Sequence, residues 1–217
     1  MIFTLYILVL CTCFVCSLVS FRLHYAWHLR LFSVLIGISV LTEWLAFYGP
    51  GIFNMNSNYL FYNVFLLLQY IVYAFFFRVV LPAGKIKNSI PPFIVAFGIF
   101  WLLTSFTVFG LQAWNSYVVI VGDVFTILAA CHYFYTIFTA DTLLNFSTSA
   151  EFWITAGLFI YCSCELPVTG MLNYLAYHHE ELTLDLYAVL QWLNILMYSI
   201  FLYAFLCPLK INTTKSS

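Results

Sequence analysis

The chain has 217 residues, of which 65% are hydrophobic and 7% are charged, and its formal net charge is −1. Soluble globular domains carry about 25% charged residues, so this composition excludes an ordinary soluble domain and indicates a protein that crosses a membrane several times. With only seven Lys and Arg residues, no basic surface for nucleic acid is expected, and the expected surrounding partner is the lipid bilayer.

Hydropathy divides the chain into seven apolar segments of about 17 to 25 residues, the length that a helix needs to cross a bilayer. They cover residues 2–20, 31–49, 59–81, 92–110, 117–139, 151–175 and 186–207. We therefore expect an all-α fold in which residues 1–217 form one domain, a bundle of seven transmembrane helices. The first segment has no basic region before it and no small-residue cleavage site, so we expect it to be a helix of the bundle.

The basic residues all fall at loops or ends that would share one face of a seven-span bundle. They are Arg22, Arg30, Arg78, Lys85, Lys87, Lys210 and Lys215. The remaining loops lack Lys and Arg, and the last of them carries Glu180, Glu181 and Asp185. Because cytoplasmic loops carry an excess of Lys and Arg, we expect an outside N-terminus, an inside C-terminus and a location in the cell (cytoplasmic or inner) membrane.

Neither a metal nor a cofactor is expected. The seven cysteines lie within or at the end of apolar segments, without the spacing of a zinc site. His24 and His28 have the i, i+4 spacing that would suit a metal on a helix, but no third ligand lies near them in the sequence. The stretch "YHHEE" at 177–181 is the best metal candidate, and a solvated loop is the favoured interpretation because adjacent histidines point in different directions.

Polar side chains inside the membrane gather at one depth. At 1.5 Å of rise per residue, three acids and several amides fall in the outer half of the bilayer or near its middle, and the inner half is almost purely apolar apart from His132. These candidate ligand-binding residues are Glu43, Asn63, Gln69, Asp123, Glu165, Gln191 and Asn194. An ionisable side chain at such depth costs about 2.5–3.5 kcal/mol on insertion scales, so it is a candidate functional site. We expect a polar cavity open to the outside; the alternative is that each acid donates one hydrogen bond between neighbouring helices.

Helical spacing places several of these side chains on common faces. Tyr187, Gln191, Asn194 and Tyr198 follow the pattern i, i+4, i+7, i+11, and Tyr62, Gln69 and Tyr73 form a similar stripe. A carboxamide that faced lipid would leave its donors and acceptors unsatisfied. Both stripes should therefore face the interior of the bundle.

Pro167 follows Glu165 by two residues and Gly170 follows shortly after. Proline removes one helical hydrogen bond and clashes with the preceding turn. We therefore expect a hinge at Pro167 and Gly170, where ligand binding could be converted into helix movement.

The sequence contains traces of a 3+1+3 parallel repeat. "LTEWLAFYG" resembles "SCELPVTG", and "LLQY" resembles "VLQW", which would pair Glu43 with Glu165 and Gln69 with Gln191 across a pseudo-twofold axis. Such a repeat would place the site on the bundle axis.

The last apolar segment lacks the lysine of retinal proteins and the histidines of ceramidase-type hydrolases. The hallmarks of G-protein-coupled receptors are also missing, as are the proline–glutamine pairs of small sugar and cystine carriers. The stretch "EFWITAGLFIYCSCELPVTGMLNYL" resembles a group of uncharacterised bacterial seven-helix proteins, many of which look like sensory partners of histidine kinases. The resemblance implies a small sensor without an enzymatic domain of its own, and it transfers no functional residue.

Three functions remain open at this point. The first is a receptor-like sensor that binds a small ligand, a cation or protons in the outer cavity and passes a helix movement to a cytoplasmic-side partner, such as a histidine kinase. The second is a small transporter or proton-coupled carrier that uses the same acids. The third, an enzyme with Glu165 or Asp123 as general acid or base, is the least favoured because no nucleophile–base pair or metal cluster is visible; no enzymatic activity is expected.

Overall fold

The computed structural model describes residues 2–22, 25–55, 57–108, 110, 113–139, 149–178 and 180–214, without side-chain placement at 173–174, 176–178, 180–181 and 208–214. The helices are α1 (Ile2–Ser17), α2 (Val19–Arg22), α3 (Trp27–Phe53), α4 (Tyr59–Val80), α5 (Lys85–Leu103), α6 (Ser116–Thr139), α7 (Ala150–His178) and α8 (Glu180–Thr214), with a π-helical turn, η1 (Thr104–Val108), after α5.

Seven helical segments within the described residues are long and apolar enough to cross a membrane, which confirms the expected all-α bundle. The start of α5 differs from the expectation, because the helix begins at Lys85 although its apolar stretch was expected to start at 92. Pro91 and Pro92 lie inside the helix, and the polar turn before them is helical too. Hydropathy finds only the part of a helix that lies in hydrocarbon, so polar end turns escape it.

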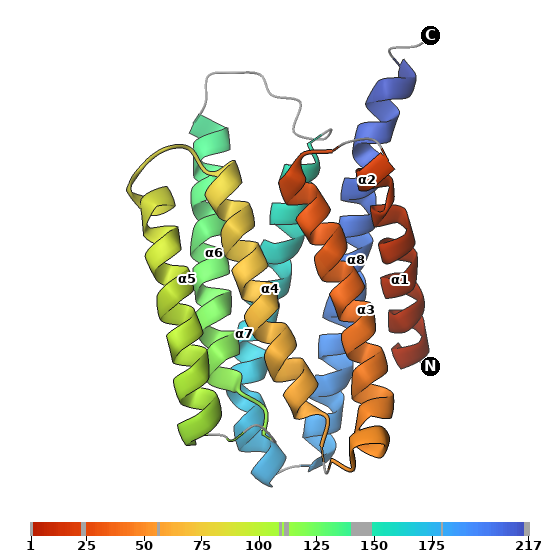
Figure 1. Ribbon diagram of the computed structural model, residues 1–217, viewed down its shortest axis with the longest axis vertical. Helices are drawn as coiled ribbons and strands as arrows, with labels where there is room; N and C mark the ends of the chain where they lie inside the picture. The colour runs from red at the N-terminus through yellow and green to blue at the C-terminus, as the bar shows by residue number, and fades with distance from the viewer. Residues whose placement is uncertain are drawn as a thin grey trace.

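The helices run side by side in one bundle (Figure 1), and the contacts between six of them form a closed ring. The order around the ring is α1, α3, α4, α6, α7 and α8, and α8 packs back against α1. Helix α5 stands outside the ring, against α4 and α6. The space enclosed by the ring is therefore bordered by the helices that carry the candidate acids.

One end of the bundle carries the basic side chains. Arg22 ends α2, Arg78 lies in the last turn of α4, and Lys85 begins α5. These segments lie at the end of the bundle where α8 also finishes, at the top of Figure 1. We call it the basic end, and the other the opposite end.

Aromatic rings fill the centre of the bundle near the basic end. Phe32 of α3 is fully buried, and its ring centroid lies 5.0 Å from that of Phe76 and 5.6 Å from that of Phe201, in edge-on arrangements. The ring of Tyr73 stacks on Phe32 at 5.9 Å. Edge-on and offset contacts of this kind are the favoured geometries of aromatic pairs. These four residues, which we call the aromatic plug, tie α3, α4 and α8 together.

The half of the bundle near the basic end is less purely apolar than the sequence suggested. His28 Nε2 lies 3.0 Å from Glu151 Oε1, which joins the start of α3 to the start of α7. The hydroxyls of Ser20 and Ser33 are hydrogen-bonded at 2.7 Å between α2 and α3. The half that was expected to be almost purely apolar apart from His132 therefore also contains these two polar pairs. Glu151 lies at the edge of its apolar segment, and its partner is distant in sequence, so hydropathy gave no sign of the pair.

Candidate ligand-binding cavity

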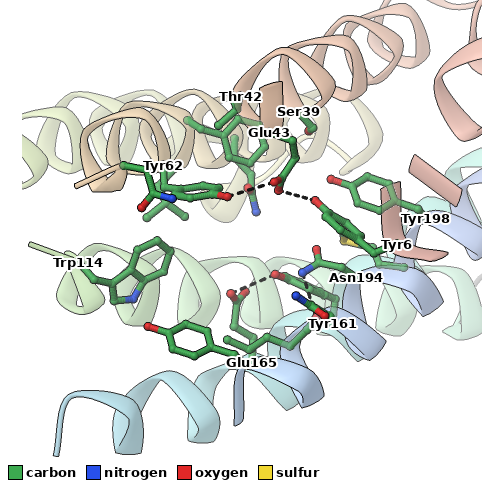
Figure 2. Close-up of a pocket in the computed structure, with 18 of the residues that line it drawn as sticks. Tyr6, Ser39, Thr42, Glu43, Tyr62, Trp114, Tyr161, Glu165, Asn194 and Tyr198 are labelled. Atoms are coloured by element: carbon green, nitrogen blue, oxygen red, sulfur yellow. Dashed lines mark hydrogen bonds between the residues drawn. The ribbon is translucent and has the colours of Figure 1, made fainter. Parts of the chain in front are cut away.

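A cavity of about 440 Å³ lies toward the opposite end of the bundle, enclosed by α1, α3, α4, α7 and α8 (Figure 2). Its polar lining consists of Tyr6, Ser39, Thr42, Glu43, Asn58, Tyr59, Tyr62, Gln69, Tyr161, Glu165, Tyr187, Gln191, Asn194 and Tyr198. The rest of the lining is Phe3, Phe65, Leu66, Trp114, Leu172, Leu190 and Met197. The volume is typical of sites for small molecules.

The structure brings five of the seven candidate residues to this cavity: Glu43, Gln69, Glu165, Gln191 and Asn194. They come from two pairs of helices, α3 with α4 and α7 with α8, which lie far apart in the sequence and on different sides of the ring. The polar groups expected at one depth thus surround a common space.

Helical spacing located one wall of the cavity well. All four members of the stripe on α8, from Tyr187 to Tyr198, line it. On α4, Tyr62 and Gln69 line it, whereas Tyr73 belongs to the aromatic plug nearer the basic end. A stripe along a helix indicates the face that is buried, but it does not indicate where along that face a cavity ends.

Glu43 is held by tyrosines from two other helices. Its Oε1 accepts a hydrogen bond of 2.7 Å from the Tyr6 hydroxyl of α1, and its Oε2 accepts one of 3.1 Å from the Tyr62 hydroxyl of α4. Figure 2 shows the two tyrosines on either side of the carboxyl group. Both oxygens therefore have donors from the protein, and the group connects α1, α3 and α4.

Glu165 lies on the other side of the cavity in Figure 2, and its hydrogen bonding is incomplete. Its Oε1 accepts a hydrogen bond of 3.0 Å from the hydroxyl of Tyr161, one helical turn earlier in α7. Its Oε2 is buried and has no hydrogen-bond partner among the described residues, and the residue as a whole is 5% exposed. Buried carboxyl oxygens are usually satisfied, so this atom lacks the hydrogen-bond donor that such a group normally has.

Asp123 lies outside the cavity lining, fully buried on α6. Its Oδ1 accepts a hydrogen bond of 2.8 Å from the hydroxyl of Tyr70. The Tyr70 ring lies against Gly122, where an added Cβ would come within 2.5 Å of the ring. Asp123 also interacts electrostatically with Glu165. It therefore joins α4 to α6 and stands behind the cavity wall rather than in it.

Asn63 also lies outside the lining and acts as a clamp on the segment before α6. Its Nδ2 donates to the carbonyl of Ala113 at 2.9 Å, and its Oδ1 accepts from the backbone N–H of Asn115 at 3.2 Å. The indole N–H of Trp101 donates to the Asn63 carbonyl at 2.8 Å. These bonds hold both neighbours of Trp114, whose side chain lines the cavity. Asn63 is thus a positioning residue for that indole.

Sequence reasoning did not single out several lining residues. Tyr161 precedes Glu165 by four residues, a spacing that could have revealed it. Tyr6 lies in a helix with uniformly apolar sequence, and Trp114 lies outside any helix, so neither carries a periodic signal. Their positions depend on contacts with distant segments.

The proposed hinge lies in an unbroken helix. Helix α7 continues through Pro167 to His178. Pro167 and Gly170 are both exposed, and an added Cβ at Gly170 would meet nothing within 4 Å. The two residues lie on the face of α7 that points away from the cavity. A hinge at this place would therefore be on the outer face of the helix.

Metal ligands do not gather in the part of the chain that the structure describes: it contains no group of three or more His, Cys, Asp or Glu side chains suited to a metal ion. His24 and the side chains of 177–181 lie outside the described residues.

Comparisons with known proteins found no family model, no curated protein and no solved structure that matches this chain.

Proposed function

We propose that this protein is a receptor-like membrane sensor, which binds a small ligand in the cavity and passes a helix movement to a partner at the basic end. The observation that carries the proposal is the cavity of about 440 Å³ beside a buried Glu165 oxygen that no described residue satisfies. A membrane signalling protein such as a histidine kinase is the kind of partner that we propose. The chain itself performs no enzymatic step in this proposal.

The sidedness of the site follows from the charge pattern. Because basic loops stay on the cytoplasmic side, the basic end is assigned to the cytoplasm and the N-terminus to the outside. The cavity then faces the exterior. A ligand would reach it from outside the cell, and a partner would read the basic end.

The aromatic plug favours a sensor over a carrier. Phe32 and Phe201 are 0% and 1% exposed, so the rings leave little space between the cavity and the basic end. A carrier must provide a polar route on both sides of its site. The closed packing therefore supports one-sided access.

Helix α7 supplies a physical connection from the cavity to the basic end. It carries Glu165 beside the cavity and, near its start, Glu151, which pairs with His28 of α3. A ligand shifts the equilibrium between two arrangements of this helix only if it binds the two with different affinity. Contact with Glu165 is where that difference would arise.

A carrier remains the second candidate because of the order of helix contacts. Under a 3+1+3 parallel repeat, α1, α3 and α4 would be equivalent to α6, α7 and α8, and α5 would be the unpaired span. The observed contacts match this equivalence: α1·α3 corresponds to α6·α7, α3·α4 to α7·α8, and α8·α1 to α4·α6. Glu43 and Glu165 would then be equivalent positions, and both line the cavity. This correspondence supports the repeat that the sequence suggested, and such repeats are common in transporters.

Access can be tested with cysteine variants in intact cells. Asn58→Cys places a thiol in the cavity lining, and Lys85→Cys places one at the basic end. A membrane-impermeant maleimide should label the first variant from outside and the second only after permeabilisation, with the unaltered protein as background. The reverse pattern would overturn the assigned sidedness, and no labelling of the first variant in either state would overturn an open cavity.

Transport can be tested in liposomes that contain the purified protein and a pH-sensitive dye. A sensor should let protons cross no faster than protein-free liposomes do when a pH gradient is imposed. Rapid proton flux that disappears in Glu165→Gln would instead support the carrier.

A further inference from the structure

We propose that the ligand of this cavity is a small organic cation, an amine or quaternary ammonium, with Glu165 as its counter-ion and aromatic rings as its walls. The inference rests on the ligand-binding role proposed above and narrows it to one chemical class.

The charge of the lining selects against anions. Glu43 and Glu165 are its ionisable acids, and none of the lining residues in the described chain is Lys, Arg or His. Asp123 stands behind Glu165 and interacts with it electrostatically. An anionic ligand would meet like charge with no cation to offset it, whereas a cation would find an opposite charge at low dielectric.

The two acids of the lining differ in how many of their oxygens already have a hydrogen-bond donor. Glu43 already accepts hydrogen bonds from Tyr6 and Tyr62 on its two oxygens. Glu165 has one oxygen with no partner among the described residues. A bound ammonium would satisfy that oxygen by an N–H hydrogen bond or by charge alone, so Glu165 is assigned as the direct counter-ion.

Aromatic side chains make up nine of the lining residues, and six of them are tyrosines. Rings attract a cation over their faces, and Trp and Tyr surround quaternary ammonium groups in known recognition sites. Tyr62 and Trp114 meet edge to face, with ring centroids 6.4 Å apart, so their planes form adjoining walls. A neutral sugar would use the amides Gln191 and Asn194 but would bring no opposite charge to Glu165.

The test compares choline with 3,3-dimethylbutan-1-ol, which has the same shape with carbon in place of the charged nitrogen. Binding to the purified protein is measured in detergent by calorimetry or by the shift in unfolding temperature, at constant ionic strength. Choline should bind at least about tenfold more tightly than its neutral counterpart, because only choline gains the ion pair and the cation–π contacts. Equal binding of the two compounds, or no binding of choline, would overturn the inference.

Variants identify the counter-ion. Glu165→Gln should weaken choline binding by about tenfold or more, and Trp114→Leu by about threefold to tenfold. Asp185→Asn removes an exposed acid that is not part of the cavity lining and should leave choline binding unchanged. An equal loss in Asp185→Asn and Glu165→Gln would contradict the assignment. Because the comparison of choline with its isostere needs no variant, it remains decisive if Glu165→Gln does not fold.

The two proposals fail in different ways. If the protein binds glucose, loses that binding in Gln191→Leu and does not bind choline, the inference of a cationic ligand is wrong but the proposed ligand-binding function is retained. A cavity that cannot be labelled at Asn58→Cys would remove the proposed function itself.

Discussion

The two ends of this bundle use similar aromatic residues in different ways. Near the basic end, Phe32 packs edge-on against Phe76 and Phe201, and all three rings are almost fully buried. At the opposite end, tyrosine hydroxyls point at carboxyl groups around an open space. Ring packing holds the helices together at the basic end, whereas hydrogen bonds between tyrosines and carboxyl groups surround the cavity at the opposite end.

The comparison extends to the two carboxyl groups of the cavity. Glu43 joins three helices through hydrogen bonds to both of its oxygens. Glu165 makes its one described bond to Tyr161 within its own helix. Glu43 should therefore contribute mainly to assembly and Glu165 mainly to binding.

The largest loss of stability is expected in the aromatic plug. Phe32→Ala should lower the free energy of unfolding by about 3–5 kcal/mol, because it leaves an empty volume among rings that cannot close over it. Unfolding by a denaturing detergent measures the change. Phe106→Ala is the control, since that ring is 64% exposed at the bundle surface; a similar loss in both variants would mean that the plug contributes no special stability.

Replacing Glu43 should produce a smaller loss. Glu43→Leu removes two hydrogen bonds between helices and leaves the hydroxyls of Tyr6 and Tyr62 without their acceptor, at a cost of about 1–3 kcal/mol. The same unfolding assay measures it. An unchanged stability would show that the two tyrosines find other acceptors.

A double-mutant cycle isolates one of these bonds. Tyr6→Phe combined with Glu43→Leu should give a coupling energy of about 0.6–2 kcal/mol, the range measured for hydrogen bonds between membrane helices. Tyr161→Phe combined with Glu43→Leu serves as the control pair and should be additive, because Tyr161 bonds to Glu165 instead.

The smallest effect on stability is expected at Glu165. Glu165→Leu loses a bond within one helix but also removes an unsatisfied buried oxygen, so the free energy of unfolding should change by less than about 1 kcal/mol. Retained fold with lost ligand binding supports the division of roles. A loss greater than that of Glu43→Leu would show that Glu165 is a structural bond between helices.

The sequence was sufficient for the helices and for much of the cavity. Hydropathy located seven spans, and helical spacing placed Gln191 and Asn194 on the buried face of α8. Depth alone could not separate Glu165, which lines the cavity, from Asp123, which lies behind its wall, because helix rotation depends on packing such as that of Tyr70 against Gly122.

The loops and end turns were harder to predict. The clamp of Asn63 on the segment before α6 and the pair between His28 and Glu151 join residues that are far apart in the chain. No local pattern marks such partners, since the spacing along the sequence carries no information on which helices become neighbours.

Helix α5 supplies none of the cavity lining and stands beside a ring that closes without it. A fluorescent label on its outer surface, for example at the 64% exposed Val95, would therefore lie beside the ring without occupying the cavity. The fourth span thus offers an attachment point for an optical reporter of the helix movement that we propose.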